Sequence, residues 1–151
     1  MEYTDNNGIK LFSNIIYPGE EKMLEFTVGQ LHTMTPIKIP IYVNRSKNPG
    51  PTIMFSAGMH GDEINGIDIV REIISKNINK PKCGTIICIP IFNLLSFYNQ
   101  ARDLPDGRDL NRAFPGSNAG SLASMLANKI TKEIIPNIDL IIDFHTGGDK
   151  R

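Results

Sequence analysis

Hydrophobic and polar residues change their spacing several times along the chain, and this spacing predicts four strands. The segment Ile37–Val43 alternates with period two, which is typical of a half-exposed strand, and Pro40 suits an edge position within it. Three other segments are short and almost continuously apolar: Thr52–Ala57, Thr85–Pro90 and Asp139–Phe144. Runs of this kind are typical of strands that are buried on both faces, as in the centre of a parallel sheet.

Two further segments place apolar residues three or four positions apart and predict amphipathic helices. In the first helix, which Asp62 is expected to cap, the apolar positions are Ile64, Ile67, Val70, Ile74 and Ile78. In the second helix, which Pro136 closes, they are Leu122, Leu126, Ile130 and Ile134. Strands and helices therefore alternate along the chain, and this order predicts an α/β layer fold with a largely parallel central sheet.

The remaining segments lack a sustained period. The first 36 residues are rich in turns and predict only one short strand, around Phe26–Val28. Residues 93–120 are dense in Asn, Arg, Asp, Pro and Gly, and a loop of this length inside a compact domain usually carries function. The last predicted strand runs into a Gly-Gly loop with no later element to cover its faces, so we expect the chain to be the N-terminal part of a longer protein.

Composition narrows the class of protein. The 151 residues suit one domain, and 16 Lys and Arg balance 16 Asp and Glu. Because no basic run is present, we expect neither a nucleic acid nor an anionic membrane as a partner. No apolar stretch approaches the roughly 20 residues that span a bilayer, and we see no export signal. Cys83 and Cys88 do not form a disulfide framework, so we expect reduced thiols and a cytoplasmic protein.

Candidate chemistry is concentrated directly after two of the buried strands, where α/β sheets bind their ligands. His60 and Glu63 stand three residues apart at a strand-to-helix turn, and His145 follows the last strand. If these strands are parallel neighbours, two imidazoles and a carboxylate meet, which is the ligand set of a catalytic zinc with an open position. Each histidine by itself is more often a surface or capping residue, and His32 is expected to be structural or solvated.

Three segments, in the same order along the chain, resemble the succinylglutamate desuccinylase/aspartoacylase family of zinc carboxypeptidase-like hydrolases. These segments are Gly58–Glu63, Asp109–Gly116 and Asp143–Gly148. The resemblance extends from about Ile37 onward and implies α/β/α layers around a mostly parallel mixed sheet. It also implies that residues 1–36 form an N-terminal segment, and that residues 37–151 form the N-terminal part of a zinc-hydrolase catalytic domain whose C-terminal half is missing.

The same resemblance implies a role for each polar residue of the motifs. One Zn²⁺ per chain is implied to bind His60, Glu63 and His145. Asn111 and Arg112 are implied to hold the carboxylate of the substrate, because a guanidinium offers a bidentate fork and an amide adds a neutral donor.

Two other positions follow from the resemblance. Arg102 is implied to polarise the scissile carbonyl, although Arg108 is a close rival for that role. Asp109 matches a carboxylate that accepts the second ring N–H of the first zinc histidine and so fixes its orientation.

In this family the general base is a glutamate that follows the second zinc histidine, and only six residues follow His145 here. Glu72 and Glu133 are both predicted on exposed helix faces. We therefore expect the whole protein to hydrolyse the amide bond of a small N-acyl amino acid with a free carboxylate, and the chain alone to be inactive. Two alternatives remain: a carboxypeptidase-like hydrolase of peptides or cell-wall fragments, and a non-catalytic metal- or ligand-binding domain. The protein could form a homo-oligomer under any of these interpretations.

Overall fold

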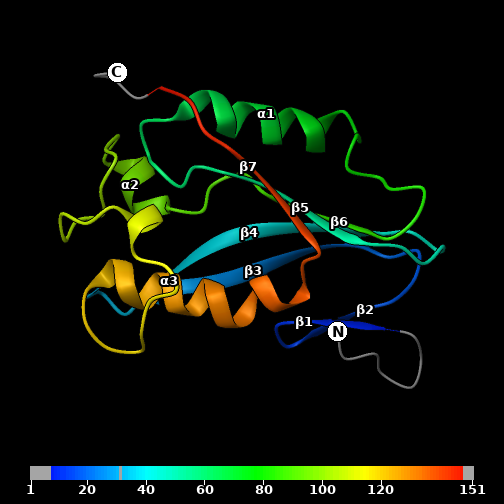
Figure 1. The fold of residues 1–151 in the computed structure, drawn as a ribbon, viewed down its shortest axis with the longest axis horizontal. Helices are drawn as coiled ribbons and strands as arrows, with labels where there is room; N and C mark the ends of the chain where they lie inside the picture. Colours follow the sequence, from blue (N-terminus) through cyan, green and yellow to red (C-terminus); the bar gives the residue numbers. More distant parts are fainter. Residues whose placement is uncertain (1–7, 31, 148–151) are drawn as a thin grey trace.

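A computed structural model describes residues 8–30 and 32–147 of the chain, which form a mixed α/β structure around a five-stranded sheet (Figure 1). The elements in chain order are β1 (Ile9–Leu11), β2 (Asn14–Ile16), β3 (Glu21–Gln30), β4 (Pro36–Arg45), β5 (Thr52–Ala57), α1 (Ile64–Ser75), β6 (Thr85–Ile89), α2 (Leu94–Tyr98), η1 (Leu110–Arg112), α3 (Leu122–Glu133), η2 (Ile135–Asn137) and β7 (Leu140–Phe144). None of the described helices has the length and apolar character needed to cross a membrane.

The strand order of the main sheet is β3-β4-β6-β5-β7. The strands β6, β5 and β7 run parallel, whereas β4 is antiparallel to both β3 and β6. Four of the five strands therefore run in the same direction and only β4 opposes them, so the sheet is mixed and mostly parallel, as predicted. The strands before His60 and before His145 were predicted to be parallel neighbours. This prediction is confirmed, since β5 pairs with β7 along Ile53–Ala57.

Helices cover both faces of the sheet and produce the expected three layers (Figure 1). On one face α1 packs Ile67 and Val70 against Ala57 of β5 and Cys88 of β6. On the other face α3 and the β1–β2 hairpin enclose the larger core, whose strand residues include Leu24, Phe26, Ile39, Ile41, Met54 and Ile87. Alternate residues of the central strands β5 and β6 serve opposite layers, so the sheet holds the ends of these two strands rigidly between two cores.

The N-terminal region contains more strand than the sequence indicated. β3 spans ten residues, not the short segment Phe26–Val28, and pairs with β4 over most of its length. Its exposed positions include Glu21, Met23 and Glu25, and only Leu24 and Phe26 are buried, so its pattern of buried apolar residues is sparse. Pro40 lies in an interior strand, yet β4 pairs with β6 only through Tyr42–Arg45, so the proline occupies a stretch without that second neighbour.

Several predicted helix and strand ends are wrong. The N-cap of α1 is Glu63 and not Asp62, and the helix ends at Ser75, so Ile78 lies beyond it and is exposed. The long polar segment is not structureless, because it contains α2 and η1. The apolar run of the last strand is typical of burial on both faces, but β7 is an edge strand of the described sheet and exposes Leu140, Ile141 and Ile142, in agreement with our expectation that no later element covers its faces.

Candidate metal centre

The turn that carries His60 and Glu63 is enclosed by the segment that follows β6. Phe92 N–H donates to the carbonyl of Ala57 and Asn93 N–H donates to that of Gly58, which continues the pairing beyond the strand ends. Gly61 N–H then donates to Ala101 O at 2.9 Å. A Cβ atom on Gly61 would lie 2.0 Å from the backbone of Ser96, so only glycine fits.

Glu63 brings both predicted histidines together at this turn. Its Oε1 lies 2.8 Å from His60 Nδ1, and its Oε2 lies 2.8 Å from His145 Nδ1. The ligand atoms that the three side chains offer lie within 4.8 Å of one another. Glu63 occupies the N-cap position of α1 without capping the helix, because its carboxylate is engaged by the histidines and by Thr146 N–H.

The second nitrogen of each imidazole faces a further carboxylate. His60 Nε2 lies 3.1 Å from Asp109 Oδ1, and His145 Nε2 lies 2.7 Å from Asp143 Oδ2. The sequence analysis assigned Asp109 but overlooked Asp143. A signal for it existed, because residues two apart at a strand end point to the same side.

The protonation chemistry of this arrangement fits a bound cation. A neutral imidazole carries one N–H and cannot donate at both ring nitrogens. In each histidine both nitrogens face carboxylate oxygens, so the Nδ1 side requires either an additional proton or a cation. At His60 the Arg102 guanidinium also lies near this nitrogen, with Nη1 3.3 Å from Nδ1, whereas Nδ1 of His145 has no such neighbour among the described residues. Metal-bound histidines commonly donate their other N–H to a carboxylate, as Nε2 of His60 and His145 can do here.

The electrostatics keep the carboxylates ionised. Burial alone would raise the pKa of Glu63, but hydrogen bonds from His60, Thr146 N–H and His145 outweigh it and hold that pKa below its ordinary value. The pKa of Asp109 is lowered in the same way, since the donors His60 and Arg102 overcome its burial. For His145, burial would lower the pKa, but the charges of Asp143 and Glu63 raise it.

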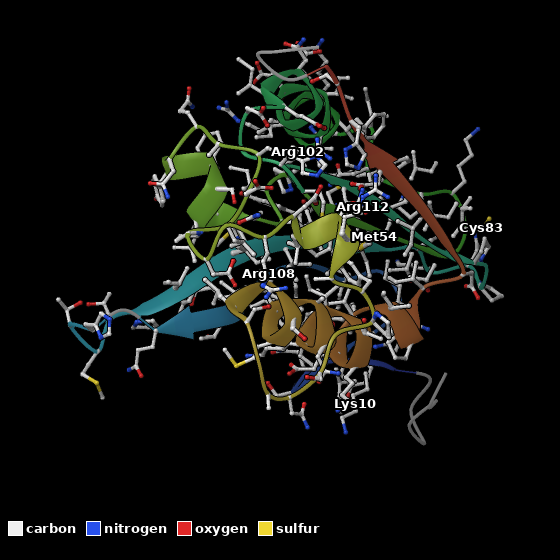
Figure 2. The ribbon with its side chains drawn as sticks, turned by 60° about the vertical axis from the view of Figure 1, so that its left-hand side comes forward. Lys10, Met54, Cys83, Arg102, Arg108 and Arg112 are labelled. Atoms are coloured by element: carbon white, nitrogen blue, oxygen red, sulfur yellow. The ribbon has the colours of Figure 1, made fainter. Side chains whose placement is uncertain are left out.

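Arg102 lies inside the cluster. Its Nη2 donates to Asp109 Oδ2 at 2.8 Å, and its Nη1 lies 3.4 Å from Glu63 Oε1. Arg108, its rival for the role at the scissile carbonyl, is exposed and lies nearer to the start of α3, whereas Arg102 lies towards α1 (Figure 2). The structure thus places Arg102, and not Arg108, beside the candidate ligands.

Asn111 and Arg112 belong to η1, whose N-cap Asp109 accepts a hydrogen bond from Asn111 N–H. Both residues are exposed. Arg112 lines an open hollow of about 370 Å³ next to Asp109, and the other lining residues are Arg108, Ala113, Ser121 and Ser124. Asn111 is not among them. The Asp109 carboxylate, which lies beside His60, and the side chains of Arg108 and Arg112 therefore line the same hollow.

The remaining candidate residues lie elsewhere. His32 is exposed and lines a different, largely apolar hollow between β3, α2 and α3. Cys83 and Cys88 are free cysteines, the first exposed and the second buried, and burial raises the pKa of Cys88 to about 12. Neither cysteine belongs to the His/Glu cluster, which is the group of potential metal-ligating residues found in the described part of the chain.

Residues 49–151 match the model of the succinylglutamate desuccinylase/aspartoacylase catalytic domain. The chain belongs to this family. Within it, the chain is 34% identical over 113 residues to the N-α-acetyl-L-2,4-diaminobutyric acid deacetylase of Halomonas elongata. That alignment covers 74% of the chain and 33% of the deacetylase, so the chain spans about a third of that relative.

Solved structures of the family share the fold. An aspartoacylase family protein from Mesorhizobium loti superposes with a TM-score of 0.74 at 30% identity, over 85% of this chain and 40% of that protein. The product-bound ectoine utilization protein of Ruegeria pomeroyi gives a TM-score of 0.74 at 26% identity, over 95% of this chain and 44% of that protein. A carboxypeptidase A-like structure from Shewanella denitrificans, at 15% identity and a TM-score of 0.62, shares the fold alone.

Proposed function

We propose that this family member acts as a zinc-dependent hydrolase that cleaves the amide bond of a small N-acyl amino acid and releases a carboxylate and a free amine. The observation that carries the proposal is the His60–Glu63–His145 cluster, in which Glu63 contacts Nδ1 of both histidines. Membership of a family that includes a deacetylase of an N-acetylated amino acid supports the reaction class.

In this proposal His60, Glu63 and His145 hold the zinc. When bound, zinc supplies Lewis acidity, which polarises an acyl oxygen and makes bound water a nucleophile near pH 7. With zinc bound, Asp109 and Asp143 would accept the Nε2–H of the two histidines and leave each Nδ1 deprotonated and free to act as a ligand.

The arginines provide the charge that the substrate requires. Arg112 lines the hollow beside Asp109, and its fork suits a bidentate pair with the free carboxylate of an N-acyl amino acid. We assign Asn111 as a neutral donor to the same carboxylate. We assign Arg102, whose guanidinium lies beside Glu63, as the donor to the oxygen that gains negative charge during attack.

The general base is assigned outside these 151 residues. Glu72 forms an ion pair with Lys76 on the exposed side of α1, and Glu133 is exposed at the end of α3. Because the chain spans 33% of the deacetylase of Halomonas elongata, we propose that the base comes from the polypeptide that such relatives have in addition. The free cysteines are consistent with our proposal of a cytoplasmic location.

The test uses protein expressed from the complete reading frame and loaded with zinc. N-acetyl and N-succinyl amino acids are supplied, and the released amine is quantified. We expect hydrolysis that disappears on chelation, returns with zinc and is lost in His145→Ala. Release of amine that is unchanged by chelation would refute zinc dependence, and cleavage of peptides with no deacylation would favour the carboxypeptidase-like alternative.

A further inference from the structure

Ser56 is a buried residue of β5 that contacts the candidate metal centre without touching a ligand. It is 1% exposed and is the register partner of Asp143 across the β5–β7 pair. Its hydroxyl donates to Asp143 Oδ1 at 2.8 Å, and Oδ2 of the same carboxylate lies 2.7 Å from His145 Nε2. A line of hydrogen bonds therefore runs from Ser56 through Asp143 to His145.

Of the three candidate ligands, His145 has the side chain that is least enclosed by neighbouring residues. Its side chain is 34% exposed, whereas those of His60 and Glu63 are 2% and 5% exposed. It follows β7, an edge strand of the described sheet, while the other two ligands lie in the enclosed turn. The orientation of the His145 ring consequently depends on its two carboxylate partners, Glu63 and Asp143.

The two carboxylates beside the histidines are held differently. Asp109 receives hydrogen bonds from the Arg102 guanidinium and from Asn111 N–H. Within the described residues, the donor that holds Asp143, apart from His145 itself, is the Ser56 hydroxyl. Loss of that hydroxyl would leave Asp143 Oδ1 without its donor and the carboxylate free to rotate away from His145.

We propose that Ser56 is a positioning residue of the metal centre, which fixes the carboxylate of Asp143 and through it the ring of His145. The proposal rests on the proposed function, because it takes His145 as a metal ligand. Partners one step behind a metal ligand typically change metal affinity by about 10–100-fold when they are removed. Since Ser56 acts through one such partner, we expect an effect of about tenfold.

The test measures zinc affinity by competition with a chromophoric chelator, in protein from the complete reading frame. Ser56→Ala is expected to weaken zinc binding about tenfold. Thr52→Val is the matched control, because Thr52 is a fully buried residue of the same strand whose hydroxyl has no hydrogen-bond partner among the described residues. The control variant is expected to bind zinc as tightly as the unaltered protein.

A second pair of variants separates the hydroxyl from packing. Ser56→Thr and Ser56→Val add similar volume but only threonine keeps the donor, so threonine is expected to bind zinc about tenfold more tightly than valine. In an Asp143→Ala background, which removes the acceptor of the Ser56 hydroxyl, Ser56→Ala is expected to have no further effect, because Ser56 acts through that carboxylate. The cobalt-substituted Ser56→Ala protein is expected to show altered d–d absorption bands, which a purely structural role would leave unchanged.

Each outcome decides the assignment. Equal zinc affinity of Ser56→Thr and Ser56→Val, or an undiminished effect of Ser56→Ala in the Asp143→Ala background, would overturn the role of Ser56 while leaving the metal centre intact. Failure of the unaltered protein to bind zinc would instead overturn the metal centre, and the positioning role with it.

Discussion

His60 and His145 lie with their ring centroids 5.1 Å apart, and each directs Nδ1 at a different oxygen of Glu63. One histidine comes from the turn after β5 and the other from the end of β7, so the pairing of these parallel strands brings them together. Glu63 therefore joins two segments that are distant in sequence. This arrangement makes the three side chains interdependent.

Zinc binding is expected to require all three residues. Replacing His60, Glu63 or His145 by Ala leaves two protein ligands, whereas catalytic zinc sites use three. We expect each variant, after dialysis, to contain far less zinc by elemental analysis than the unaltered protein. His32→Ala is the control, because His32 is exposed and lies outside the cluster. Full stoichiometric zinc with unchanged affinity in His145→Ala would show that the site is misassigned.

Arg112→Lys is expected to weaken recognition of the substrate carboxylate. A lysine supplies a point charge but not the bidentate fork. A charge-assisted hydrogen bond contributes about 1.5–3 kcal/mol, so kcat/KM for an N-acyl amino acid is expected to fall roughly ten- to a hundredfold. Arg71→Lys is the control, since Arg71 pairs with Asp68 on the exposed side of α1. An unaltered kcat/KM in Arg112→Lys would remove Arg112 from the substrate site.

The parts of the fold that were predicted correctly have strong local patterns. The apolar runs of β5 and β6 and the helical spacing of α3 each reflect burial that the residues themselves encode. The positions of His60, Glu63 and His145 after parallel strands were sufficient to predict their meeting, because the carboxyl ends of such strands share one edge. β3 was largely missed because charged residues alternate with a few buried ones along it.

Contacts that depend on cross-strand register could not be read from spacing along the chain. Ser56 donates to Asp143 because β5 and β7 align these two residues, and a shift of one residue would separate them. The position of Arg102 depends on how the segment after α2 folds back over the turn at Gly61, which no local pattern specifies. The cap at Glu63 was missed for a similar reason, since its carboxylate binds histidines and not the helix.

The metal-free protein is expected to lose stability as the pH rises through the raised pKa of His145. Burial would lower the pKa of His145, but Asp143 and Glu63 raise it, so the protonated ring stabilises the folded state. This contribution is fully present below the ordinary histidine pKa of about 6.5 and is lost as the pH rises through the raised pKa. The lowered pKa values of Glu63 and Asp109 act at the acid end, where their contribution is lost as the pH falls through those values.

Urea unfolding in the presence of a chelator provides the measurement. We expect a higher midpoint at pH 5.5 than at pH 8.5, and a smaller difference in His145→Gln, which cannot be protonated in this range. With saturating zinc the trend is expected to reverse, because the ion competes with protons for the imidazoles. Identical pH dependence of the chelated protein and His145→Gln would rule out this ion-pair contribution.

Gly61→Ala is expected to disrupt the turn that presents His60. The added Cβ would lie 2.0 Å from the carbonyl group of Ser96, so the backbone must shift. Overpacking of this kind costs about 1–3 kcal/mol of unfolding free energy, and the shift is expected to lower zinc affinity as well. Gly29→Ala is the control, because its nearest neighbour would be Ile37 Cδ1 at 4.0 Å. Thermal unfolding and zinc titration of both variants test the prediction, which fails if Gly61→Ala matches the control.

The 151-residue chain expressed by itself is expected to self-associate through β7. Leu140, Ile141 and Ile142 are 52%, 40% and 38% exposed on consecutive positions, so both faces of this edge strand present apolar side chains to water. Exposed, apolar edge strands are templates for pairing with another chain. Ile141→Lys is expected to reduce the mass measured by light scattering, because a charge on the strand disfavours edge-to-edge pairing. Ile78→Lys is the control, since Ile78 is also exposed but lies after α1, outside any strand. Monomeric behaviour of the unaltered chain, or equal effects of the two lysines, would show that β7 does not mediate association.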